Sequence, residues 1–138
     1  MEDTREPLRR NLVAGLLLIA AGLLFGAFMA AARDVDFVEK WFRSPPMRSN
    51  QVMYAHAHFG VIGLANIAIG LVLPLARLGA RVRWAFSWAA VASGVLVPAG
   101  MMLALLPEPW DRFVYLQAGG FGLLLCATVG TAWALLRR

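Results

Sequence analysis

The sequence NLVAGLLLIAAGLLFGAFMAAA, residues 11–32, contains no charged side chain. Three more uncharged stretches follow, at residues 51–76, 84–107 and 113–136. Each is longer than the roughly 20 apolar residues that a helix needs to cross about 30 Å of hydrocarbon. Strands of a membrane barrel would alternate apolar and polar residues, and these stretches do not alternate. The sequence therefore predicts an all-α, integral membrane four-helix bundle that forms a single domain over residues 1–138.

The composition supports this interpretation. Hydrophobic residues make up 60% of the 138 residues and charged residues make up 15%. Soluble domains average roughly 45–50% apolar and about 25% charged residues. A cleaved signal peptide has an apolar segment of only about 7–15 residues. Since the first uncharged stretch is longer, we interpret it as a membrane span.

The connections between the spans predict how the helices are arranged. Residues 77–83 and 108–112 are short connections, so consecutive helices are expected to be antiparallel neighbours. The first connection is longer and includes the amphipathic sequence VDFVEKWF at residues 35–42. We expect this sequence to lie along the outer surface of the membrane that the helices span. Glycines within the spans, such as Gly22 and Gly26, are expected to allow close helix packing.

The distribution of basic residues predicts the orientation of the chain. Eight of the 13 arginines and lysines lie in the two terminal tails and the second connection, and five lie in the first and third connections. The positive-inside rule then places both termini in the cytoplasm. The net charge of +5 is explained by arginines that flank the spans and meet anionic lipid head groups. No nucleic-acid partner is therefore predicted.

Polar side chains inside a bilayer are costly, so each one is a candidate functional residue. No span contains an acidic residue, so a carboxylate proton relay is not expected. The second span is the richest in polar groups, with Gln51, Tyr54, His56, His58 and Asn66. Neutral imidazole is the commonest protein ligand for metals and also binds haem iron. The histidine pair is therefore the strongest candidate site, although a hydrogen-bonded histidine between helices is an equally simple interpretation.

Helix geometry separates the two histidines. Residues two apart on a helix point about 160° from each other, so His56 and His58 cannot bind one ion from the same side. His56 shares a face with Gly60 and Gly63, which favours contact with a neighbouring helix. His58 lies on the opposite face with the small Ala65, where a planar macrocycle would find space.

Methionines offer a weaker signal for copper. Met29, Met47, Met53, Met101 and Met102 all fall in the predicted outer half of the spans or in the first connection. Thioether and imidazole ligands suit copper(I) or a haem axial pair, although methionine is also an ordinary filler of apolar cores. The sequence contains no phosphate-binding loop, nucleophile elbow or zinc-type cysteine pair.

Three short motifs resemble the bacterial styrene oxide isomerases. These are YAHAHFG at residues 54–60, LFG at residues 24–26 and WA at residues 88–89. Members of that family are small four-helix proteins of the bacterial inner membrane. They convert epoxides to aldehydes by Lewis-acid chemistry at a ferric haem b, and they assemble as trimers with haem between subunits. The resemblance implies haem b as cofactor, His58 as iron ligand, a small hydrophobic epoxide as substrate and a homo-oligomer.

The chain also departs from that family. The family's asparagine lies closer to the histidine than Asn66, which is eight residues beyond His58. The family's catalytic tyrosine has no counterpart at residues 91–95, which read VASGV. Tyr54 and Asn66, both within about 80° of His58 on the helix, are the candidate catalytic residues. Haem binding is thus better supported than isomerase activity, and a non-enzymatic haem or copper protein or an accessory subunit of a membrane complex are the alternatives.

Overall fold

The structure, a computed structural model, describes residues 5–32, 35, 46–104 and 110–137, and the side chains of these residues except 46–51, 110 and 111. Within these residues the chain is helical and contains no strand. The elements are α1 (Arg5–Ala32), α3 (Pro46–Val72), η1 (Leu73–Leu75), α4 (Ala80–Leu103), η2 (Trp110–Phe113) and α5 (Val114–Leu136). Four of the helices are long and apolar enough to cross a membrane, which confirms the predicted all-α class and its four candidate spans.

The first two long helices begin before the predicted spans. α1 begins at Arg5, and an ion pair of 3.1 Å between Arg10 and Glu6, one helical turn apart, supports its first turns. α3 begins at Pro46, because the fixed φ angle of proline suits the first position of a helix. The surface segment predicted at residues 35–42 falls, after its first residue, outside the described residues.

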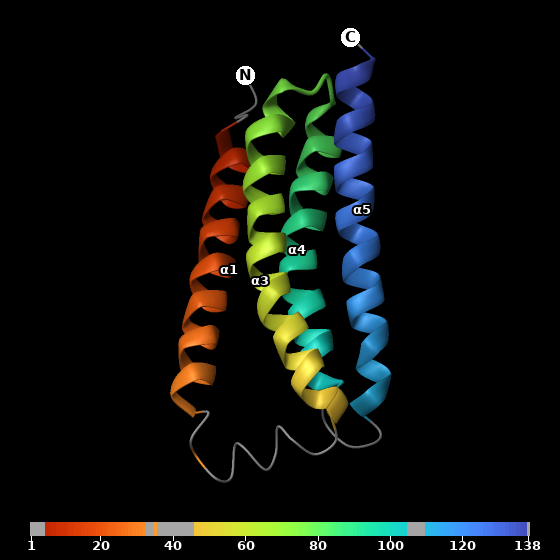
Figure 1. Ribbon diagram of the computed structural model, residues 1–138. Helices are drawn as coiled ribbons and strands as arrows, with labels where there is room; N and C mark the ends of the chain where they lie inside the picture. Colours follow the sequence, from red (N-terminus) through yellow and green to blue (C-terminus); the bar gives the residue numbers. More distant parts are fainter. Residues whose placement is uncertain (1–4, 33–34, 36–45, 105–109, 138) are drawn as a thin grey trace.

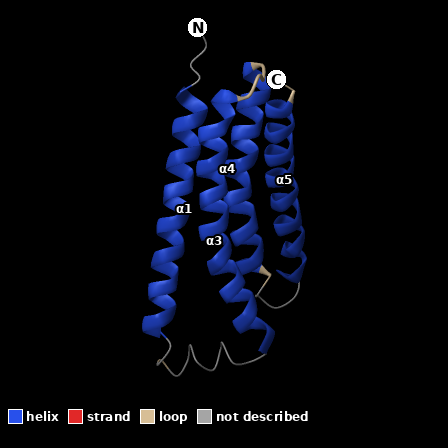
Figure 2. Cartoon of the chain, turned by 45° about the horizontal axis from the view of Figure 1, so that its top comes forward, coloured by secondary structure: helices blue, strands red, loops and turns tan. Residues whose placement is uncertain are grey.

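The helices form two antiparallel pairs. α1 packs along α3 and α4 packs along α5, while α3 and α4 bring the pairs together (Figure 1). α1 begins and α5 ends at the same end of the bundle, named here the termini end, where α3 is also connected to α4 (Figure 2). Gly79 precedes α4 with an extended backbone, at φ −61° and ψ 151°, so this short connection needs no left-handed residue.

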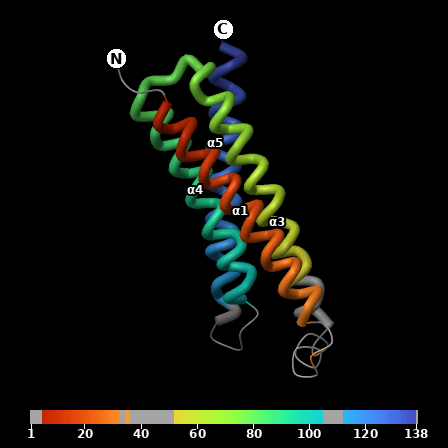
Figure 3. Tube along the Cα trace, turned by 90° about the vertical axis from the view of Figure 1, so that its left-hand side faces the viewer, coloured from red at the N-terminus to blue at the C-terminus, as the bar shows by residue number. Residues whose placement is uncertain are grey.

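The two pairs are in close contact at the termini end and diverge toward the opposite end (Figure 3). Buried polar side chains join them. The hydroxyl of Ser87 on α4 donates to the Oδ1 atom of Asn11 on α1. The side-chain amide of Asn66 on α3 donates to the carbonyl oxygen of Ala90 on α4 at 2.9 Å. Because hydrogen bonds between helices are well retained in an apolar surrounding, these contacts fix the relative position of α1, α3 and α4.

Glycines set the distance between α1 and α3. A Cβ atom placed on Gly15 would lie 2.5 Å from the carbonyl oxygen of Gly63, and one placed on Gly22 would lie 2.9 Å from the Cβ atom of Phe59. The backbones therefore approach closely only because side chains are absent there, as predicted from the small residues. Gly60 differs, since a Cβ atom there would meet nothing within 4 Å.

Candidate functional site

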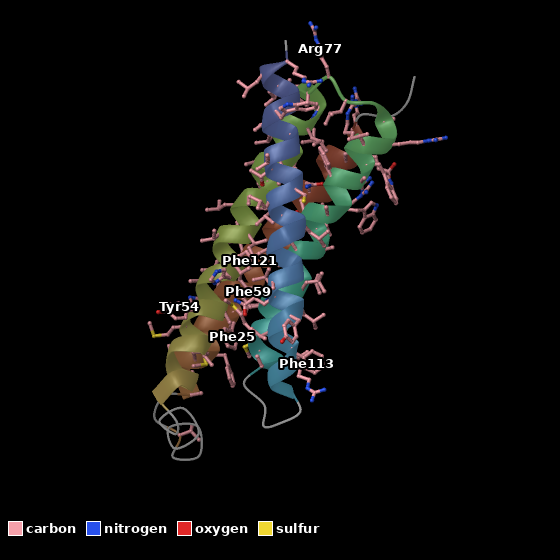
Figure 4. All side chains as sticks on the ribbon, turned by 90° about the vertical axis from the view of Figure 1, so that its right-hand side faces the viewer. Phe25, Tyr54, Phe59, Arg77, Phe113 and Phe121 are labelled. Atoms are coloured by element: carbon pink, nitrogen blue, oxygen red, sulfur yellow. The ribbon has the colours of Figure 1, made fainter. Side chains whose placement is uncertain are left out.

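His56 belongs to the contact between α1 and α3. A Cβ atom placed on Gly26 of α1 would lie 2.6 Å from the Cε1 atom of the His56 ring. The ring centroid of Phe25 lies 6.3 Å from that of His56, and Phe25 and Phe59 come from the two facing helices (Figure 4). The predicted packing of His56 against a neighbouring helix is confirmed. The space beside its ring is filled by α1, which leaves no room there for a planar cofactor.

His58 lies on the opposite face of α3 and is half-buried. Its Nδ1 atom is 2.6 Å from the carbonyl oxygen of Tyr54, one turn earlier. A carbonyl oxygen can only accept, so Nδ1 carries the hydrogen and donates it. In the neutral ring the Nε2 atom then holds an available lone pair. Histidines that bind metals usually donate their other ring N–H to a carbonyl or carboxylate in this way, which fixes the tautomer and the ring orientation.

α5 supplies a further contact to His58. The ring of Phe121 meets the His58 ring edge-on, with centroids 5.4 Å apart and planes at 73°. Phe121 is visible on α5, at a level near Phe59 of α3 (Figure 4). The Phe121 ring restricts rotation of the His58 imidazole, and the hydrogen bond to the Tyr54 carbonyl, one turn earlier on α3, restricts it further. The sequence did not indicate Phe121, because nothing in the pattern of α5 marks which of its aromatic residues faces α3.

Tyr54 and Asn66 lie in different surroundings. The side chain of Tyr54 is 59% exposed, and its backbone carbonyl, rather than its phenol, makes the observed contact with His58. Asn66 is fully buried, and its amide also donates to the carbonyl oxygen of Ile62 at 3.1 Å. It lies roughly 12 Å farther along the helix axis than His58. The structure therefore brings Tyr54 to His58 and places Asn66 in the contact with α4, away from the half-exposed surface of His58.

His, Cys, Asp and Glu side chains form no metal-binding cluster with His58 in the described part of the chain. That part contains no cluster of three or more His, Cys, Asp or Glu side chains able to hold a metal ion. Cys126 is exposed on α5. Met53, which is 66% exposed, is the methionine nearest to the histidines along the chain. The described His, Cys and carboxylate groups thus offer a single imidazole rather than a complete ligand set.

No protein-family model, curated protein or solved structure matches this chain. The class that the fold defines is an all-helical protein with four helices able to cross a membrane. The candidate site is defined by the geometry of His58 and its two neighbours.

Asn66→Ala is expected to lower stability by about 0.5–2 kcal/mol, because the bond to the Ala90 carbonyl joins α3 to α4. Thermal unfolding in detergent would measure the loss. Thr128→Ala is the matched control, since the Thr128 hydroxyl bonds only within its own helix, to the Leu124 carbonyl. A folded Asn66→Ala protein that fails to bind haem would instead give Asn66 a role at the cofactor.

Proposed function

We propose that this protein is a multi-pass membrane protein that binds haem b through the Nε2 atom of His58. The observation that carries the proposal is the hydrogen bond of 2.6 Å from His58 Nδ1 to the Tyr54 carbonyl. It leaves Nε2 as the ligand atom on the face of α3 opposite to His56, whereas the His56 ring packs against Gly26 of α1.

The donor set fits a haem better than a bare ion. The described residues bring one imidazole to this surface, and one imidazole is sufficient for haem iron because the porphyrin supplies the equatorial nitrogens. Copper(I) held by methionine and histidine is the second candidate, supported by the methionine content alone. An accessory role in a membrane complex is the third.

When bound, a ferric haem would supply a Lewis acid able to polarise the oxygen of an epoxide. The chain's own contribution is positional. His58 would hold the iron through Nε2, the Tyr54 carbonyl would hold the tautomer of His58, and Phe121 would restrict rotation of its ring. The apolar surroundings of the spans would admit a small hydrophobic substrate and exclude water. By this proposal the protein acts as an intramolecular oxidoreductase that isomerises epoxides to aldehydes, as its resemblance to styrene oxide isomerase suggests.

Optical spectroscopy tests the cofactor directly. Protein produced with a supply of haem and purified in detergent should show a Soret band, and the pyridine haemochrome spectrum should identify haem b. Protein that shows no Soret band after purification and after titration with haemin would contradict the proposal. Titration with copper(I) of the same preparation would then test the second candidate. The mass of the purified protein in detergent would test whether it forms a homo-oligomer, which the resemblance implies is a trimer.

Tyr54→Phe is expected to leave the Soret band unchanged, because the contact to His58 comes from the backbone carbonyl, which phenylalanine retains. If the phenol contacts an oxygen ligand or substrate, epoxide turnover should fall while haem content stays constant. Ala57→Ser, at an exposed position three residues after Tyr54 on α3, is a matched control for a local change of polarity. Loss of haem in Tyr54→Phe would contradict the role assigned to the carbonyl.

We also propose that both termini lie in the cytoplasm of a bacterial cell, with the protein in the inner membrane. Support comes from the arginines in the first turns of α1, in the α3–α4 connection and in the first turn of α4, which lie at the termini end. The positive-inside rule expects this end to face the cytoplasm. Reporter fusions after residue 138 and within residues 36–45 should report opposite sides of the membrane. A fusion after residue 138 that is active only in the periplasm would contradict this orientation.

A further inference from the structure

A second site lies at the termini end, far from the histidines. A cleft of about 500 Å³ opens there between the first turns of α1 and the beginning of α4. Its walls include Glu6, Pro7, Ala80, Arg81, Arg83 and Trp84. None of these residues is part of the proposed haem site, so the cleft has no assigned role.

The cleft is positively charged. Arg81 is exposed, and Arg83 is held by a bond of 3.0 Å from its Nη2 atom to the Leu78 carbonyl. The Nε atom of Arg83 is buried and makes no hydrogen bond among the described residues. Glu6 is the one acidic residue among the described residues lining the cleft, and it is paired with Arg10 at 3.1 Å. Glu6 offsets one of the two positive charges of Arg81 and Arg83, and the described cleft walls keep a net positive charge.

The beginning of α4 adds to this charge. The N-cap residue Gly79 provides no side-chain hydrogen bond, and the first turn of the helix contains no acidic residue. The N–H groups of this turn and the positive end of the helix dipole are suited to an anion. Together with the two arginines, they give the cleft the chemistry of a phosphate site.

An aromatic surface continues from the cleft along α4. Trp84 and Trp88 are one helical turn apart and are 53% and 44% exposed. Their rings meet edge-on with centroids 5.9 Å apart. The guanidinium carbon of Arg10 lies 5.7 Å from the Trp84 ring centroid and 4.5 Å from that of Trp88. Tryptophans at this position are typical of the level where lipid head groups meet hydrocarbon chains.

We propose that this cleft binds the phosphate of an anionic phospholipid, with the head group in the cleft that Arg81 and Arg83 line and the acyl chains along Trp84 and Trp88. The exposed tryptophans distinguish a lipid from a soluble phosphate compound, because only a lipid has apolar chains to cover them. Anionic lipids are attracted to basic residues at the cytoplasmic surface, and a cleft between helices converts that attraction into a defined site.

The test uses the full chain, purified in detergent and freed of lipid. Native mass spectrometry would follow its titration with phosphatidylglycerol and with phosphatidylcholine of the same acyl chains. The wild type should bind phosphatidylglycerol in preference. In the Arg81→Gln/Arg83→Gln variant this binding should weaken by roughly tenfold or more. Arg77→Gln/Arg137→Gln is the matched control, because it removes the same charge from exposed residues at the same end, outside the cleft lining.

Each outcome decides the proposal. Equal weakening in the control variant would show general attraction to the basic end and would overturn the cleft as a site. Equal binding of both lipids would overturn the preference for an anionic head group, because phosphatidylcholine carries the same phosphate but no net charge. Stabilisation of the wild type by inorganic phosphate, to the same extent as by phosphatidylglycerol and lost in the cleft variant, would overturn the lipid in favour of a soluble phosphate. If the double variant does not fold, Arg81→Gln alone, at an exposed position, should still weaken phosphatidylglycerol binding.

Discussion

His58→Ala is expected to abolish the Soret band of the purified protein, whereas His56→Ala is expected to retain it. His58 presents Nε2 on a half-exposed face because its Nδ1 atom is bonded to the Tyr54 carbonyl. No second imidazole can replace it, since His56 is the only other histidine in the sequence and is enclosed by α1 on the other face. Absorption spectra at equal protein concentration measure the effect.

Imidazole added to the His58→Ala protein provides the sharpest control. A small ligand that enters the space left by the side chain should restore part of the Soret band, and this would separate loss of the iron ligand from loss of the fold. His56→Ala should instead lower the unfolding free energy by about 2 kcal/mol, because it leaves a void against Gly26. The assignment would be overturned if His56→Ala lost haem and His58→Ala kept it.

Gly15→Ala is expected to produce the largest loss of stability among single-methyl additions between α1 and α3. The added Cβ atom would lie 2.5 Å from the Gly63 carbonyl oxygen and 2.6 Å from the Cγ1 atom of Ile67. A backbone oxygen cannot move aside as a flexible side chain can, so the two helices must separate. We expect a loss of about 1–3 kcal/mol, measured by thermal or denaturant unfolding in detergent.

The control for this prediction is another glycine of the same helix pair. Gly60→Ala adds the same methyl group on α3 where nothing lies within 4 Å, so its effect should stay within about 0.5 kcal/mol. Equal destabilisation by both changes would mean that the loss comes from the helix backbone itself rather than from the contact. Gly15→Ala as stable as the wild type would show that α1 and α3 do not approach as closely as described.

The number and order of the helices could be predicted because the spans are long and uncharged. Two features of the site could also be predicted, namely the opposite orientation of His56 and His58 and the packing of His56 in a helix contact, since both follow from the helical repeat. The start of α1 at Arg5 was missed because the predicted span was bounded by the first charged residue before it. A charged residue ends an uncharged stretch but does not end a helix.

Apart from the glycine-lined face of α3 that holds His56, the rotation of each helix about its own axis could not be predicted. Soluble helices reveal their buried face by an apolar stripe, but in these helices the apolar residues are spread around the axis without a clear stripe. This is why Asn66 was named with Tyr54 as a candidate catalytic residue near His58, whereas in the structure its amide donates to the carbonyl oxygen of Ala90 on α4. It is also why the contact between Phe121 and His58 became known only from the structure.

The arrangement in two helix pairs has a consequence for how the chain is made. During synthesis α1 and α3 leave the ribosome before α4, and their glycine contact can close without any later helix. At that stage the amide of Asn66 keeps only the Ile62 carbonyl of its own helix as acceptor, and the Oδ1 atom of Asn11 lacks the Ser87 hydroxyl. Polar groups that lack a partner in hydrocarbon are costly, so, in the membrane location proposed above, the first helix pair would favour the arrival of α4. The polar groups of the first pair would then be the attachment point for the second, and hydrogen bonding would order the assembly.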